Sequence, residues 1–316
     1  MQNKQLRGTI YILMATIIWG STFVAQSSVS EKIPTFTFQG IRSLVGVIFL
    51  AVLSLILDMI SKKRGTYQEP SRQETKLLLG GGLVCGIVLF GAMNLQQFGM
   101  HYGTEAGKAG FITAMYMLIV PVLGLFLKKK VPVNVLAGIC MAVVGLFLLC
   151  MSDGMQGFVK GDIYVMLCAV VFAVHIMFVD YFAPKVDGVK LSLIQFIVAG
   201  VISCICMFIF DKPNVNDIYL ARWEILYAGI GSTGIAYTLQ IVGQKYSPPT
   251  LASLVMSFES VFAMLSEIVV FLIVPTFGGG VLSLPNTKEV IGCIIMFTAI
   301  MLAQFEFPGK SKKITE

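Results

Sequence analysis

Residues Thr238 to Tyr246 read TLQIVGQKY and repeat the pattern of Asn94 to Tyr102, NLQQFGMHY. Four residues match at a constant spacing of 144: Leu95, Gln96, Gly99 and Tyr102 with Leu239, Gln240, Gly243 and Tyr246. A second echo, at a spacing of 153, joins GTIYILMATIIWG from Gly8 to GDIYVMLCAVVFA from Gly161. Two echoes in the same order predict a duplicated chain, with a first repeat at 1–153 and a second at 154–316.

The composition places the duplicated halves in a membrane. Hydrophobic residues make up 56% of the 316 residues and charged residues 13%. A soluble domain carries roughly a quarter charged residues, and no soluble fold hides so much apolar surface in a chain of this length. We therefore expect an all-α polytopic membrane protein.

Charged and turn-rich gaps divide the chain into ten apolar runs. Each run approaches the roughly 20 residues that a helix needs to cross a bilayer. They cover 8–28, 35–60, 77–98, 106–127 and 133–151, then 162–182, 191–210, 225–243, 251–274 and 288–307. Because five spans per half is an odd number, the second repeat must be inverted relative to the first, as in many secondary transporters.

The distribution of lysine and arginine predicts the orientation. With the N-terminus inside, 16 of the 23 lysines and arginines flank the spans on the cytoplasmic side and six lie outside. Cytoplasmic loops of membrane proteins carry such an excess of lysine and arginine. This pattern predicts a cell-membrane protein with both termini in the cytoplasm. The net charge of +6 then reflects topology, so no nucleic-acid partner is expected.

Other segment and site types find no support in the sequence. The first span lacks a small-residue cleavage site and is expected to stay as a permanent helix. The seven cysteines fall within spans, without disulfide or metal-ligand spacing. No phosphate-binding glycine loop is present, so neither a metal nor a cofactor is expected.

Polar side chains within spans suggest where a solute could bind, because they are costly in hydrocarbon and usually face protein or water. In the first span these are Trp19 and Thr22, and in the third Asn94 and Gln97. His175 in the sixth span matches Thr22 at a spacing of 153. It could bind solute or carry protons, or it could be a buried histidine with its hydrogen bonds satisfied.

The ninth span carries further candidates for a solute-binding site. Ser257, Phe258 and Glu259 lie near its middle, and a carboxylate there could bind a solute amine or carry a proton. Alternatively, Glu259 could pair with Arg42, the one cation well inside a span. The Gly-rich stretch 274–287 follows this span as a long loop.

These segments resemble the EamA-like family of the drug/metabolite transporter superfamily. The resemblance rests on WGSTFV from Trp19, Arg42, AGFITAMY from Ala109, VGLFLL from Val144, and ASLVMSFESVFA from Ala252. It implies two inverted five-helix repeats around a central cavity and the movement of small metabolites, often outward. The family's usual proline after its ninth-span glutamate is Ser260 here, so this helix is expected to be straighter.

The sequence therefore predicts a secondary transporter of small metabolites, amino acids or related amphipathic solutes, that works by alternating access. Trp19, Tyr237 and Phe258 would form apolar walls, and Thr22, Asn94, Gln97, His175 and Ser257 would donate or accept hydrogen bonds. Glu259 and His175 are the candidates for proton coupling. Lipid would surround the protein, and because ten spans can enclose a site, a monomer would suffice.

Three alternatives remain open at this point. A carrier of nucleotide sugars or phosphate esters should need several cations within its spans, whereas only Arg42 is available. An intramembrane enzyme needs paired catalytic groups at one depth, and no such pair is visible. A membrane receptor would have no need of an inverted duplication.

Overall fold

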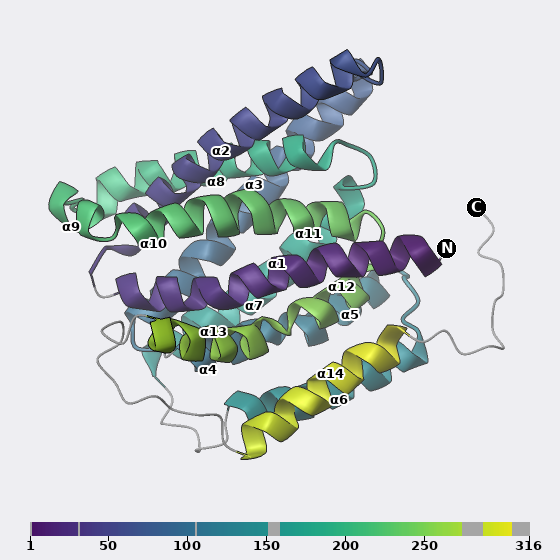
Figure 1. Ribbon diagram of the computed structural model, residues 1–316, viewed down its shortest axis with the longest axis vertical. Helices are drawn as coiled ribbons and strands as arrows, with labels where there is room; N and C mark the ends of the chain where they lie inside the picture. Colours follow the sequence, from purple (N-terminus) through teal and green to yellow (C-terminus); the bar gives the residue numbers. More distant parts are fainter. Residues whose placement is uncertain (1, 31, 105, 151–158, 274–286, 305–316) are drawn as a thin grey trace.

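The structure is a computed structural model that describes the chain apart from residues 1, 31, 105, 151–158, 274–286 and 305–316. The described residues form helices and turns, without strands. The helices run side by side, with the N-terminus and the turn between α2 and α3 at the same end of the bundle (Figure 1). The expected loop at 274–287 lies almost wholly outside the described residues.

Eight helical segments within the described residues are long and apolar enough to cross a membrane. Two shorter apolar helices, Val133–Leu148 and Val290–Ala303, accompany them. The coarse prediction of an all-helical, multi-pass membrane protein is confirmed, whereas the count of ten spans remains a prediction.

The helices of the first half follow the predicted runs closely. They are α1 (Gln2–Val29), α2 (Thr35–Lys63), α3 (Arg72–His101), α4 (Ala106–Ala114), α5 (Tyr116–Phe126) and α6 (Val133–Cys150). Helix α3 begins at a capping box, in which Ser71 and Glu74 each accept from the other's backbone N–H.

The second half repeats this order with one short added helix, α9, and with three consecutive segments where the first half has α3. It contains α7 (Lys160–Phe182), α8 (Gly188–Phe210), α9 (Val215–Leu220), α10 (Arg222–Tyr227), η1 (Ala228–Ala236), α11 (Tyr237–Gln244), α12 (Pro249–Met256), α13 (Glu259–Ile273) and α14 (Thr287–Gln304). Segments α10, η1 and α11 form one continuous span, within which η1 is a π-helix.

The packing of the helices is equivalent in the two halves. If each helix is replaced by its counterpart from the other half, the same packed pairs result. Helix α2 lies along α8, and α6 lies along α14. Helix α3 packs against α7, as η1 and α11 pack against α1. Helices α12 and α13 contact α1, as α4 and α5 contact α7.

The glycines of the sequence echoes lie where these helices cross. A Cβ on Gly8 would lie 2.7 Å from the carbonyl oxygen of Gly243, and one on Gly243 would lie 2.8 Å from that of Gly8. Gly99 and Gly161 face each other in the same way. Each crossing therefore requires glycine on both helices, and the shared pattern favours the division into two repeats.

Two equivalent aspartates join α2 and α8 at opposite ends. The carboxylate of Asp211 accepts from the backbone N–H of Thr37 at 2.7 Å and from its hydroxyl at 2.8 Å. At the other end, Lys190 Nζ lies 2.9 Å from Asp58 Oδ2. The two contacts use equivalent positions at a spacing of 153 residues: Thr37 corresponds to Lys190, and Asp58 corresponds to Asp211.

The fourth and ninth predicted spans are each interrupted near the middle. The first break separates α4 from α5 at Met115, and the second separates α12 from α13 at Ser257 and Phe258. The structure thus interrupts the ninth span before Glu259, while the expectation of a straighter helix stays a prediction. The hydroxyl of Ser257 donates to the carbonyl oxygen of Leu254 at 2.7 Å, and such bonds compete with the helical ladder even without a proline.

Candidate functional site

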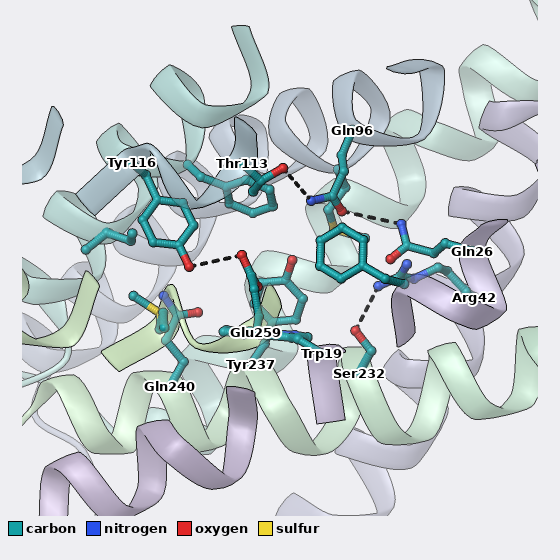
Figure 2. A pocket seen from close by; sticks show the side chains of 15 residues that line it. Trp19, Gln26, Arg42, Gln96, Thr113, Tyr116, Ser232, Tyr237, Gln240 and Glu259 are labelled. Carbon is teal, nitrogen blue, oxygen red and sulfur yellow. Dashed lines mark hydrogen bonds between the residues drawn. The ribbon is translucent and has the colours of Figure 1, made fainter. Parts of the chain in front are cut away.

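A narrow pocket lies between the two halves, at the level of both helix breaks. Its wall comes from α1, α2, α3, α4, α5, α7, η1, α11, α12 and α13. The lining residues are Trp19, Phe23, Gln26, Arg42, Met93, Gln96, Thr113, Tyr116, Phe172, Ile176, Ser232, Tyr237, Gln240, Met256 and Glu259. Figure 2 shows most of the polar groups pointing inward from different helices.

Many of the lining residues form equivalent pairs across the two halves. At a spacing of 153, Trp19 corresponds to Phe172 and Phe23 to Ile176. At a spacing of 144, Met93 corresponds to Tyr237 and Gln96 to Gln240. The pocket therefore lies where equivalent segments of the two halves meet.

One side of the pocket carries a positive charge. Arg42 is 2% exposed, and its guanidinium donates to the hydroxyl of Ser232 at 3.1 Å and to that of Thr233 at 3.4 Å. It also lies 5.6 Å from the ring centroid of Phe38. Among the described residues no carboxylate lies within ion-pair distance of Arg42.

The other side of the pocket carries a carboxyl group. Glu259 is the first residue of α13 and is 5% exposed. The hydroxyl of Tyr116 donates to its Oε1 at 3.1 Å (Figure 2). The unsatisfied N–H groups and the dipole at a helix N-terminus favour negative charge there. The alternative in which Glu259 pairs with Arg42 is not what the structure shows.

Two further polar atoms at the pocket wall lack a protein partner. The indole Nε1 of Trp19 and the amide Oε1 of Gln240 are buried and without a hydrogen bond within the described part of the chain. Since buried polar atoms are nearly always bonded, these two are suited to a polar solute or to water. Aromatic rings from Trp19, Phe172 and Tyr237 supply the apolar wall beside them.

Glutamines tie the helices together at either end of the pocket. Gln26 Nε2 donates to Gln97 Oε1 at 3.1 Å, and Gln96 Nε2 donates to the hydroxyl of Thr113 at 3.3 Å. At the opposite end, Gln240 Nε2 donates to Gln244 Oε1 at 2.9 Å within α11, and Gln244 Nε2 donates to the carbonyl oxygen of Ile176 in α7 at 3.1 Å. The cavity between them measures about 40 Å³, room for one or two water molecules. A molecule the size of an amino acid would therefore fit only after side chains or helices move.

The predicted site residues divide into two groups. Trp19, Tyr237 and Glu259 lie on the pocket wall. The others lie off it and are bonded or packed among helices: Thr22, Asn94, Gln97, His175, Ser257 and Phe258. Their part in binding stays a prediction.

His175 is the clearest member of the second group. It is fully buried, and its Nε2 lies 3.1 Å from Gln195 Oε1. Its Nδ1 has no partner among the described residues. Its ring contacts that of Tyr237 on the pocket wall, at 6.4 Å between centroids.

Sequence reasoning missed several lining residues. Gln96 and Gln240 stand inside the two repeated stretches themselves, so equivalent polar residues in the strongest echo were an available signal. Ser232 carried no such signal; it lies in the π-helix η1 and accepts a hydrogen bond from Arg42 there.

Comparisons with known proteins agree with this architecture. The sequence profile of the EamA-like transporter family matches the chain twice, over residues 6–151 and 159–305. The chain belongs to the EamA-like transporter family. Together with its apolar helices, membership identifies it as a multi-pass membrane transporter of small solutes.

Two similar proteins are named as uncharacterized transporters. An uncharacterized transporter of Archaeoglobus fulgidus is 25% identical over 269 residues, which cover 84% of this chain and 79% of the relative. The uncharacterized transporter YoaV of Bacillus subtilis is 24% identical, with 80% and 85% covered. A solved crystal structure shares the fold, with a TM-score of 0.69, 19% identity and 94% and 97% coverage.

Proposed function

We propose that this protein is a secondary transporter that exports small amphipathic metabolites, amino acids or close relatives, across the cell membrane by alternating access. In this proposal ten spans form two inverted repeats, both termini face the cytoplasm, and one chain suffices. The observation that carries the proposal is the pocket lined by equivalent residues from both halves.

The chemistry of the pocket supports a small solute with polar ends. Aromatic rings form part of the wall, while a guanidinium and a carboxyl group face the same space from different helices. Arg42 is the only Lys or Arg on the described wall of the pocket. One cation is a poor match for the multiple charges of a phosphate ester, so the phosphate-carrier alternative has little support.

Glu259 is the proposed site of proton coupling. Its carboxyl group is buried beside the pocket, and Tyr116 is its only hydrogen-bond partner among the described residues. A proton or a solute amine could neutralise it in turn, which would link solute movement to proton movement. His175 remains a second candidate, acting through Tyr237.

The direct test is flux in liposomes that contain the purified protein. With a proton gradient imposed, we expect the wild type to move neutral amino acids or related solutes and Glu259→Gln to lose the dependence of flux on the gradient. Glu69→Gln, the same change at an exposed position in the loop before α3, should behave as the wild type. Gradient-dependent flux that persists in Glu259→Gln would exclude this residue as the coupling group.

The direction of transport needs intact cells. Metabolites in medium and cytosol would be compared between cells that express the wild type and cells that express Glu259→Gln at equal membrane levels. Accumulation in the medium with the wild type alone supports export. Accumulation in the cytosol would reverse the proposed direction.

A further inference from the structure

The structure assigns a carboxylate-binding subsite to Arg42, Ser232 and Thr233. This inference rests on the proposed function and narrows it: the solute carries a carboxylate, which binds at the side of the pocket opposite Glu259 (Figure 2). Neither the family match nor the relatives assign a role to these three residues.

The first argument is the unmet charge of Arg42. A guanidinium has five N–H donors, and the structure gives it two hydroxyl partners and one aromatic ring. A buried cation within a span is costly unless it is paired. Because Arg42 also lines the pocket, an anionic group of the solute could accept from its remaining N–H donors and neutralise its charge.

The second argument is that Arg42 breaks the equivalence of the two halves. At the spacing of 153 its counterpart is Gln195, whose side chain bonds His175 and does not line the pocket. The surrounding backbone is nevertheless equivalent. A Cβ on Gly229 would lie 2.9 Å from the carbonyl oxygen of Arg42, and one on Gly86 would lie 2.6 Å from that of Gln195. The charge is thus a property of one half only, added to a shared helix crossing.

The third argument is the π-helix that supplies the hydroxyls. At the start of η1 the halves match at a spacing of 143, as Gly86 and Gly229 show, and after η1 they match at 144, as Gln96 and Gln240 show. The second half therefore holds one extra residue in between, and the π-helix Ala228–Ala236 accommodates it. Such one-residue insertions are frequent at functional sites. Here the widened turn presents Ser232 and Thr233 together to Arg42.

The geometry favours a carboxylate over a phosphate. The planar guanidinium fork matches a carboxylate through two parallel hydrogen bonds, and one positive charge neutralises one negative charge. The carboxyl group of Glu259 on the other side suits a solute ammonium group. A zwitterionic solute would then lie across the pocket, with its apolar part against Trp19, Phe172 and Tyr237.

The test compares acids with their amides. Leucine, alanine and phenylalanine would each be paired with the corresponding amide, which differs only at the carboxyl group. Binding is measured as ligand-induced thermal stabilisation of the purified full-length protein, and flux is measured in liposomes. We expect the wild type to prefer at least one acid over its amide by roughly tenfold, the scale of one charge-assisted contact.

Three variants test whether Arg42 causes the preference for the acid over its amide. Arg42→Gln places at this position the residue that the chain already holds at its counterpart, and it should abolish the preference while the amide still binds. Ser232→Ala keeps the charge and should weaken the preference, because the guanidinium loses a hydroxyl that orients it. Arg7→Gln makes the same exchange at an exposed arginine of α1 and should leave the preference unchanged.

The outcomes separate this inference from the proposed function. Acid-selective stabilisation that disappears in Arg42→Gln, without flux of any compound, would support the subsite and refute the transport proposal for these solutes. Flux with the same acid-to-amide ratio in the wild type and Arg42→Gln would support transport and overturn the subsite. A wild type that no acid stabilises more than its amide would also overturn the subsite.

Discussion

At the scale of single residues, several glycines lie where two helices approach closely. Gly20 follows Trp19 in α1, and a Cβ at this position would lie 2.7 Å from the backbone nitrogen of Ala263 in α13. The neighbouring atom belongs to the backbone and cannot rotate away. Gly20 thus allows α13 to approach the helix that carries the aromatic wall of the pocket.

A substitution of Gly20 should therefore be costly in spite of its small size. Gly20→Ala forces α1 and α13 apart, and such overpacking costs about 1–3 kcal/mol. Thermal unfolding of the purified protein should show a lowered midpoint. Gly80→Ala is the matched control, since a Cβ at Gly80 meets nothing within 4 Å. Equal midpoints for the two variants would contradict the close crossing.

At the scale of helices, the α2–α8 pair is joined at each end by an aspartate. Asp211 accepts from the N–H of the third residue of α2, a group that has no partner within the helix. Asp58 instead forms an ion pair with Lys190 that is partly open to solvent. Capping bonds and exposed ion pairs differ in strength, so the two equivalent ends are not equally stable.

Alanine substitutions should reveal this difference. Asp211→Ala leaves the α2 terminus without its acceptor and should lower the free energy of unfolding by about 0.5–2 kcal/mol. Asp58→Ala should cost less, roughly 0–1 kcal/mol, as is usual for exposed pairs. Urea or thermal unfolding would measure both, with the exposed Glu69→Ala as the control. A larger loss for Asp58→Ala than for Asp211→Ala would show that the ion pair, and not the cap, stabilises this helix pair.

Helix positions were predictable because the bilayer imposes them, whereas interruptions within helices were not. Apolar runs identified every long described helix to within several residues at each end. The break before Glu259 depends on where the Ser257 hydroxyl finds an acceptor, and the π-helix depends on a one-residue excess visible only against the other half. Both features depend on how helices pack against each other, which a single stretch of sequence does not reveal.

At the scale of the whole molecule, the sequence echoes and the pocket are related. Gly99 and Gly243 lie at equivalent crossings, and one turn earlier Gln96 and Gln240 line the pocket. The echoes therefore mark two of the helix crossings and also two residues of the pocket wall. Polar residues chosen singly, such as Asn94 and His175, proved to be bonded between helices, because depth in a span does not reveal which way a side chain points.

Labelling of single cysteines from either side of the membrane would test the central claim most directly. In a variant without the seven native cysteines, Gln96→Cys and Gln240→Cys would be exposed in turn to a membrane-impermeant maleimide in right-side-out and inside-out vesicles. The account predicts that Gln96→Cys reacts mainly from outside and Gln240→Cys mainly from inside, and that a bound solute changes both rates. Reaction of both cysteines from one side only would contradict an inverted duplication around a site with alternating access.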